Sequence, residues 1–212
     1  MKIKLDNKGF GFKEFLAVLV VILIVVLFIY KSFFNSNSKL PFKQFRSLAK
    51  DFGVHATSVR DENPALTNRI YLYDVVEKGF YDKIESPFKK GEYCDEFESK
   101  MDTRNENARS ITFKCGDYMI YNEKFENNPE DYEIYKVSAW QESKITDGDH
   151  SQELYNYSVN GKLVLDKYYV EKEFIVNYNN KTGSNITSIG QIDTSKFKLE
   201  TKVFYRTMEL VK

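Results

Sequence analysis

FLAVLVVILIVVLFIY, Phe15–Tyr30, is a run of sixteen residues without a charged side chain. An α-helix of that length is roughly 24 Å long, slightly short of the ~30 Å hydrocarbon core of a bilayer. Extension to residues 10–34 crosses the bilayer but includes Lys13 and Glu14 at one interface and Lys31 at the other, where a long side chain reaches the headgroups. The run predicts a membrane-spanning helix at 10–34 and localisation as a single-pass protein of the cell membrane.

The flanks of this run leave other interpretations open. A secretory signal peptide or a plain signal anchor also begins with basic residues, here Lys2, Lys4 and Lys8, and Ser36–Ser38 has the small-x-small pattern of a cleavage site. Basic residues also follow the run, so the positive-inside rule does not fix the orientation. We take the C-terminal side as exported because of the cysteine pair and of the residues that precede the run.

Composition limits the class of protein. The 212 residues carry 31 basic and 31 acidic side chains and are 42% apolar, which suits one ordinary domain plus an appendage. Zero net charge argues against a protein that coats nucleic acid, and nucleic acid as a partner stays open. Only two histidines are present, His55 and His150, far apart in the chain, so we expect no metal site and no cofactor. The 16% of aromatic residues favours strands.

The residues before the apolar run follow a distinctive order: Lys8 and Gly9, then Phe10, then Glu14 at the edge of the run. This order resembles the processing site of type IV prepilins and pseudopilins, in which a short basic leader ends in Gly, the first mature residue is aromatic and the fifth is Glu. The resemblance implies cleavage after Gly9 by a prepilin peptidase, methylation of the new Phe10 amine and assembly into a filament.

These residue types suit that chemistry. Gly9 has no Cβ, so the backbone can enter a tight peptidase site. Glu14 is a costly charge in an apolar helix, on the order of 2.5–3.5 kcal/mol at a membrane helix centre, unless it has a partner. In a filament the partner would be the Phe10 amine of an adjacent subunit, and the positive end of the helix dipole also favours an acid there.

Two helices are predicted after the run. Residues 35–41 are polar and end in a proline, which predicts the end of the first helix or a kink. Phe42–Phe52 has apolar residues at helical spacing and predicts a helix that packs on a sheet and stops at Gly53. Leu72–Phe80 predicts a short helix that Gly79 ends.

Strand signals dominate the rest of the chain. Runs rich in Tyr, Ile and Val, or alternating apolar and charged residues, predict strands at Ile111–Tyr121, Tyr132–Gln141, Gln152–Val159, Lys167–Tyr178 and Phe197–Tyr205. Asn160–Gly161 is a strong two-residue hairpin signal, and residues 179–188 predict a loop. The predicted fold class is α+β: a long N-terminal membrane-spanning α-helix followed by a globular domain with an antiparallel β-sheet.

Cys94 and Cys115 are the only cysteines. In an exported domain they predict one disulfide, which would stabilise the fold by about 3 kcal/mol in the chain-entropy model, with two free buried thiols as the alternative. No further Cys or nearby His completes a zinc site. The segment Tyr81–Pro87, followed by the cysteines and by Lys114–Tyr118, loosely resembles Gram-positive pilin-like proteins, in which a cysteine-bridged loop precedes a strand.

Other chemistry has little support. Asp147–Asp149 and Glu153 have oxygen ligands at a spacing suggestive of calcium but lack the rest of an EF-hand loop, so we expect a charged turn. No nucleophile elbow, P-loop or dinucleotide-binding glycine pattern occurs, so we expect no enzyme. Trp140 and the many tyrosines are interpreted as sheet core rather than a binding face.

Together these features predict a pilin-like subunit, a minor pilin or pseudopilin of a type IV pilus, a type II secretion system or a DNA-uptake filament. Its parts would be a leader at 1–9, a filament-core helix at 10–34 and an exported domain at 35–212. Expected partners are a prepilin peptidase, other pilin-like subunits, the filament assembly machinery and membrane lipid, and the assembled filament would lie at the cell surface. The alternative is a signal-anchored exported binding protein whose β-rich domain recognises a ligand at the cell surface.

Overall fold

The computed structural model describes residues 12–63, 68–105, 108–143, 152–159, 162–163 and 168–211, with the backbone alone at 12–15, 17–18, 26–39, 143, 157–159 and 162–163. The chain divides into two compact units, Met1–Lys43 and Gln44–Lys212. Gly9 and Phe10 lie outside the described residues, and Glu14 is described as helical backbone only. The predicted limits of leader, helix and exported domain stay predictions.

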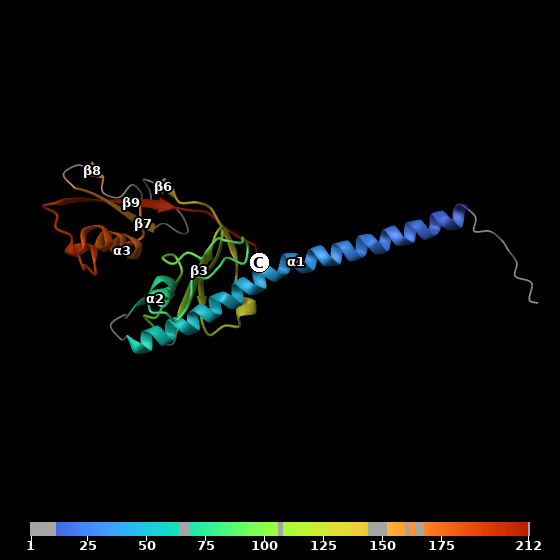
Figure 1. Ribbon diagram of the computed structural model, residues 1–212, viewed down its shortest axis with the longest axis horizontal. Coiled ribbons are helices and arrows are strands. Elements are labelled where there is room, and N and C mark those ends of the chain that lie inside the picture. The colour runs from blue at the N-terminus through green and yellow to red at the C-terminus, as the bar shows by residue number, and fades with distance from the viewer. Residues whose placement is uncertain are drawn as a thin grey trace, which may run out of the picture. The chain divides into compact units, whose positions relative to one another are not determined.

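Helix α1, Phe12–Glu62, is one continuous element of 51 residues (Figure 1). The helix continues through residues 35–41, where the sequence predicts its end or a kink. The predicted stop at Gly53 is wrong. Proline in a helix interior removes one N–H donor and crowds the preceding turn, yet Pro41 lies inside this helix. Pro41 comes one turn before the buried segment that begins at Phe45.

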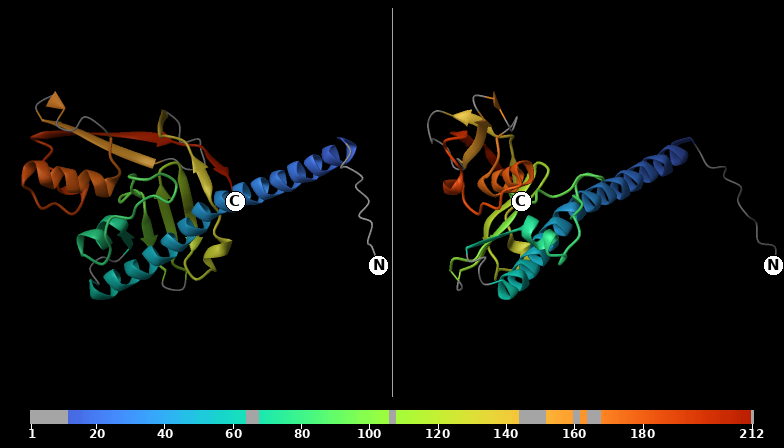
Figure 2. Two further views of the ribbon diagram at one scale, coloured as in Figure 1. Left: turned by 45° about the vertical axis from the view of Figure 1, so that its right-hand side comes forward. Right: turned by 60° about the vertical axis from the view of Figure 1, so that its left-hand side comes forward.

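A buried stripe runs along α1 within the Gln44–Lys212 unit. Its five members are spaced four and three residues apart and are fully buried: Phe45, Ala49, Phe52, Ala56 and Val59. The rings of Phe45 and Phe52 lie 5.5 and 5.7 Å from the ring of Phe113 in the sheet that this part of the helix covers (Figure 2). The predicted packing of the second helical segment on a sheet is confirmed.

The covered sheet has six antiparallel strands in the order β1-β2-β3-β4-β5-β10. They are β1 (Arg69–Tyr71), β2 (Lys100–Asp102), β3 (Ser110–Cys115), β4 (Tyr118–Lys124), β5 (Tyr135–Val137) and β10 (Met208–Leu210). Helix α2, Leu72–Glu77, follows β1, and Gly79 after it has φ +73°, as the predicted glycine stop requires. A short 3₁₀ turn, Pro129–Asp131, precedes β5.

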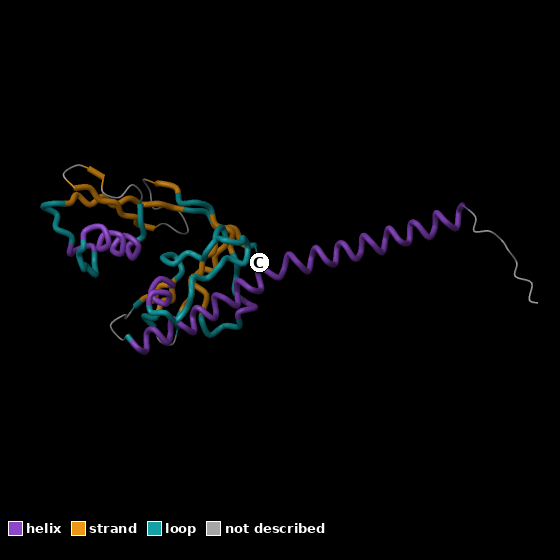
Figure 3. The backbone as a smooth tube through the Cα atoms, viewed as in Figure 1, coloured by secondary structure: helices purple, strands orange, loops and turns teal. Residues whose placement is uncertain are grey.

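A second antiparallel sheet has the order β6-β9-β7-β8. Its strands are among those drawn in orange in Figure 3. Its strands are β6 (Gln141–Ser143), β7 (Gln152–Val159), β8 (Lys162–Leu163) and β9 (Phe197–Tyr205). Strands β7 and β9 have the predicted bounds, and the pairing of Val159 with Lys162 confirms the hairpin predicted around Asn160–Gly161, residues that lie outside the described ones. The sequence predicts one sheet, and the described residues form two.

Two of the predicted strands are divided. Ile111–Tyr121 is a hairpin, because Cys115 pairs with Tyr118 across Gly116, whose φ of +56° suits the first position of a tight turn. Within Tyr132–Gln141 only β5 and the first residue of β6 belong to strands. Tyr132 and Ile134 are buried but lie outside any strand. Short strands of this kind carry too few residues for period-2 alternation to mark their ends.

The predicted strand Lys167–Tyr178 is wrong. Residues from Glu171 onward form helix α3, Glu171–Thr182, which also takes the first part of the predicted loop at 179–188. Phe174 and Tyr178, four residues apart, are its buried positions, and Gly183 ends it with φ +69°. A second 3₁₀ turn, Ile189–Gln191, follows.

The prediction of a membrane-spanning helix is also contradicted. Among the described residues, no helix combines the length and the apolar character needed to cross a membrane. The charge-free run has sixteen residues between Glu14 and Lys31, whereas a span needs about 20. The predicted transmembrane segment at 10–34 and the predicted localisation as a single-pass cell-membrane protein are therefore wrong, while the long helix and the antiparallel β-sheet of the predicted fold class are present.

Candidate functional site

The cysteine pair is the one predicted site whose side chains are described, and it forms the predicted disulfide between Cys94 and Cys115. Backbone hydrogen bonds hold both sides of it. The N–H of Cys94 donates to the carbonyl of Ile84, and the N–H of Asp95 donates to the carbonyl of Lys114, each at 2.8 Å. The bridge fastens the loop that precedes β2 to the end of β3.

An apolar surface lies exposed on α1 in the Met1–Lys43 unit. Eight apolar side chains are between 43% and 58% exposed: Leu16, Leu19, Val20, Val21, Ile22, Leu23, Ile24 and Val25. Seven of them are consecutive, so at 100° per residue they cover the full circumference of the helix over two turns. A helix that is apolar on all sides is normally buried among neighbours.

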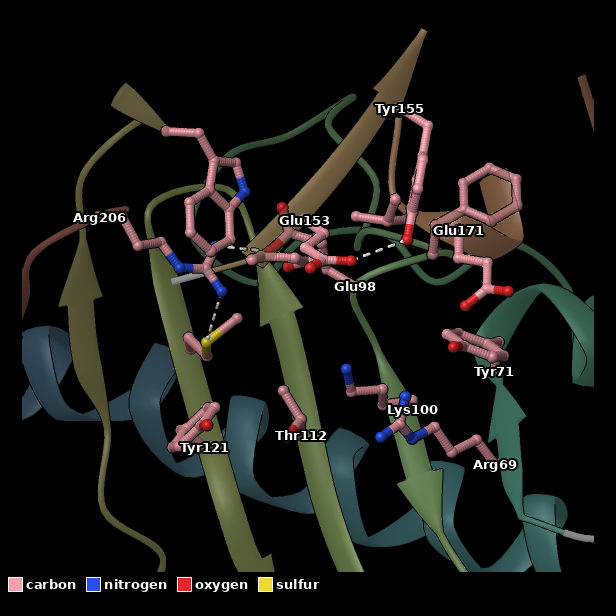
Figure 4. Close-up of a pocket in the computed structure, with 15 residues that line it drawn as sticks. Arg69, Tyr71, Glu98, Lys100, Thr112, Tyr121, Glu153, Tyr155, Glu171 and Arg206 are labelled. Atoms are coloured by element: carbon pink, nitrogen blue, oxygen red, sulfur yellow. Dashed lines mark hydrogen bonds and ion pairs between the residues drawn. The ribbon is translucent and has the colours of Figure 1, made fainter. Parts of the chain in front are cut away.

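A cavity of about 270 Å³ lies over the face of the six-stranded sheet that is turned away from α1 (Figure 4). We call it the β-face pocket; its lining is Arg69, Tyr71, Phe97, Glu98, Lys100, Thr112, Met119, Tyr121, Trp140, Gln152, Glu153, Tyr155, Val170, Glu171 and Arg206. Strand alternation produces its floor. In β1 and β2 the central Ile70 and Met101 are buried toward the helix, so their neighbours face the pocket.

Arg206 forms one end of the β-face pocket. Its side chain is 4% exposed, its guanidinium carbon lies 4.1 Å from the centre of the Trp140 ring, and its Nη1 pairs with the Glu98 carboxylate. Glu98 also lies 3.5 Å from Lys114 Nζ. Arg206 Nε and Trp140 Nε1 are buried and have no hydrogen-bond partner among the described residues. Two buried donors beside this end of the pocket are therefore without an acceptor among the described residues.

Two cations stand side by side on the floor of the pocket. Because Tyr71 pairs with Lys100 and Arg69 with Asp102, the side chains of Arg69 and Lys100 are diagonal neighbours on one face. Burial, and then the positive charge of Arg69, lower the pKa of Lys100. Burial opposes but does not outweigh the hydrogen bonds from Arg104, which lower the pKa of Asp102. Asp102 is thus committed to Arg104, and it lies 3.7 Å from Arg69.

Carboxylates form the opposite wall. The hydroxyl of Tyr155 donates to Glu153 Oε2 at 3.1 Å, and burial together with this hydrogen bond raises the pKa of Tyr155 to about 12. Glu171 is the first residue of α3 and is exposed. In the described part of the chain, neither Glu153 nor Glu171 lies within 4.0 Å of a basic nitrogen. The pocket therefore keeps its two signs of charge apart across the cavity.

Sequence reasoning missed the pocket. It assigns Trp140 to sheet core, and this residue packs beside the buried Leu154 and Phe204 while also lining the pocket. Glu153 is a pocket residue, whereas Asp147–Asp149 lie outside the described residues. The available signal was the charged-apolar-aromatic order of Arg69–Tyr71, since alternation in a short strand places the outer residues on one face.

Of the two histidines, only the side chain of His55 is described. His55 packs edge-on against the ring of Tyr81, with centroids 4.7 Å apart, and His150 lies outside the described residues. Over the ranges that the structure describes, no cluster of three or more His, Cys, Asp or Glu side chains is arranged to hold a metal ion.

Comparison with known proteins gives no relative. No protein-family model matches the chain, and neither a curated protein nor a solved structure matches it.

Proposed function

We propose that this chain is a pilin-like filament subunit, a minor pilin or pseudopilin, whose N-terminal helix is covered by the helices of neighbouring subunits. The observation that carries the proposal is the apolar surface at Leu16–Val25, half exposed in the single chain. Completing the burial of such a side chain is worth about 1 kcal/mol, roughly half of the full-burial value. Eight of them supply a driving force for assembly.

The shape of this surface favours a filament over a pairwise contact. Leu19–Val25 is exposed around the whole circumference of the helix, so one partner in one groove leaves most of it uncovered. Several neighbours are needed, and a head-to-tail arrangement of identical subunits that does not close into a ring supplies them along a helical filament. The helix of each subunit is then buried by the helices of its neighbours and helps to bury theirs.

The remaining parts of the proposal follow from the junction before the helix. Cleavage after Gly9 by a prepilin peptidase would free the Phe10 amine, and methylation would follow. Glu14 of one subunit would pair with the Phe10 amine of the next in a charge-assisted hydrogen bond that sets the register of assembly. The antiparallel sheet and the segment of α1 on it form the globular part that the filament would carry.

A matched pair of substitutions on one helix tests the proposal. Val21 and Val54 are both exposed valines of α1, at 58% and 50%, and Val54 belongs to the Gln44–Lys212 unit. Val21→Asp places a charge in the proposed filament core, so we expect incorporation into sheared surface filaments to fall at least tenfold. Val54→Asp is expected to incorporate normally.

Glu14→Gln keeps the side-chain size and removes the charge, and it is expected to fail in the same incorporation assay while cleavage after Gly9 and folding are preserved. Equal recovery of the Val21→Asp and Val54→Asp proteins in filaments would contradict the proposed role of the helix.

A further inference from the structure

The floor of the β-face pocket has two neighbouring cations, and what they could bind does not depend on filament assembly. Arg69 and Lys100 are two like charges held as diagonal neighbours on β1 and β2, an arrangement that is unfavourable by itself. Lys100 lies within 4.0 Å of no carboxylate oxygen among the described residues. An anionic group bound between the two cations would relieve their repulsion.

The carboxylates nearest to this pair are engaged elsewhere. Glu98 is shared by Arg206 and Lys114. Asp102 accepts from Arg104 Nε at 3.0 Å and from Nη2 at 2.6 Å, and reaches Arg69 only at 3.7 Å. The protein therefore pairs Arg206 with Glu98 and pairs Arg69 with Asp102 at 3.7 Å, whereas Lys100 has no carboxylate partner among the described residues.

Glu153 and Glu171 give the facing wall the opposite sign. They come from β7 and from the first turn of α3, and Figure 4 shows them across from Arg69 and Lys100. Among the described residues no ion pair joins the two sides, although all four side chains line the same 270 Å³ cavity. The rings of Tyr71 and Tyr155 line the space between them. A ligand that complements this pocket carries both charges on one compact molecule.

We propose that the β-face pocket binds a small zwitterionic ligand, with its carboxylate between Arg69 and Lys100 and its ammonium group against Glu153 and Glu171. Arginine and lysine beside each other suit a carboxylate, because the guanidinium donates two parallel hydrogen bonds and the ammonium adds a point charge. The ring of Tyr155, whose hydroxyl donates to Glu153, suits the ammonium end, since aromatic rings attract cations. The cavity volume of about 270 Å³ suits a ligand of the size of an amino acid or a single amino sugar acid.

A series of probes that differ only in their charged ends tests this. Calorimetric titrations of the full-length purified protein at low ionic strength would compare 4-aminobutanoate with butanoate and butylamine, and 6-aminohexanoate with hexanoate and hexylamine. We expect at least one of the two zwitterions to bind ten times more tightly than both of its one-charge analogues. Binding of neither zwitterion, or the lack of a tenfold preference for either zwitterion over its one-charge analogues, would overturn the proposal.

Substitutions locate the site. Lys100→Met and Glu171→Gln should each weaken binding of the preferred zwitterion at least tenfold. Lys136→Met and Glu209→Gln, both exposed on β5 and β10 outside the pocket lining, should leave it unchanged. Thermal unfolding of each variant checks that it is folded. Unchanged affinity in a folded Lys100→Met protein would contradict the site, whatever the outcome of the filament assays.

Discussion

At the scale of single residues, Gly53 shows why a glycine can lie in the middle of a helix. It is buried on α1, and a Cβ there would lie 2.5 Å from Ile111 Cδ1 and 2.7 Å from the ring of Phe125. The glycine therefore allows the helix to approach the sheet closely, and its lower helix propensity, about 1 kcal/mol below alanine, is the cost of that approach.

We predict that Gly53→Val lowers the free energy of unfolding by about 2 kcal/mol, because extra methyl groups in a packed interface force neighbouring side chains to shift. Gly190→Val is the matched control, since a Cβ added there would meet only Ser188 Oγ, at 4.0 Å, and it should change stability by less than about 0.5 kcal/mol. Urea unfolding measures both, and equal stability of the two variants would show that the helix is not held this close.

Tyr132 is a second residue whose surroundings give a measurable result. It is fully buried, and its hydroxyl donates to the carbonyl of Phe125 at 3.2 Å. Burial, followed by the charges of Glu123 and Glu126, raises the pKa of Tyr132 to about 12. The unfolded chain loses this proton near pH 10, so the folded state is favoured below pH 10 and its advantage declines as the pH rises toward 12.

The predicted consequence is a loss of up to about 2.5 kcal/mol of stability between pH 10 and pH 12 through this one residue. Tyr132→Phe should be less stable at pH 8 by about 1 kcal/mol, the value of the hydrogen bond, but its stability should fall less steeply above pH 10. Tyr121→Phe, at an exposed position, serves as the control. Parallel pH profiles for wild-type and Tyr132→Phe proteins would contradict the assignment.

At the scale of elements, the outcome for α1 and α3 shows what local patterns can predict. The apolar spacing after Pro41 correctly predicts a helical segment on a sheet, but Gly53 does not end the helix, because its close packing against Ile111 and Phe125 holds the helix on the sheet there. In α3 the aromatic and β-branched residues favour a strand, whereas burial of Phe174 and Tyr178 at helical spacing decides for a helix.

The disulfide is the element-scale feature with the clearest energetic role. It closes a loop with a sequence separation of 21 between Cys94 and Cys115. In the chain-entropy model a loop of this length stabilises the fold by about 3 kcal/mol. We predict that reduction lowers the free energy of unfolding by that amount, and that non-reducing mass spectrometry detects no alkylatable thiol before denaturation with reductant. Alkylation of two thiols in the untreated protein would contradict this prediction.

At the scale of the whole molecule, the sequence predicts the helical segment that packs on a sheet, most of the antiparallel strands and the disulfide, because each depends on a local run or on a pair of identical residues. The β-face pocket could not be predicted in the same way. Arg69, Lys100, Glu153 and Glu171 come from four elements far apart in the chain, and only the folded arrangement brings them to one cavity. In the sequence these four charged residues cannot be distinguished from ordinary surface residues.

We propose that the chain is a processed filament subunit. Both the junction at Gly9 and the exposed apolar helix take part in this function. Processing and assembly are separate steps, so a measurement on assembled material tests both. Purified filaments contain only subunits that were incorporated, and the first residue of each chain records where the leader was cut.

The most direct test is mass spectrometry of the N-terminal peptide of this chain in sheared filaments. We predict a peptide that begins at Phe10 with a methylated amine. Absence of the chain from the filaments, or a peptide that begins at Met1 or Lys39, would contradict it.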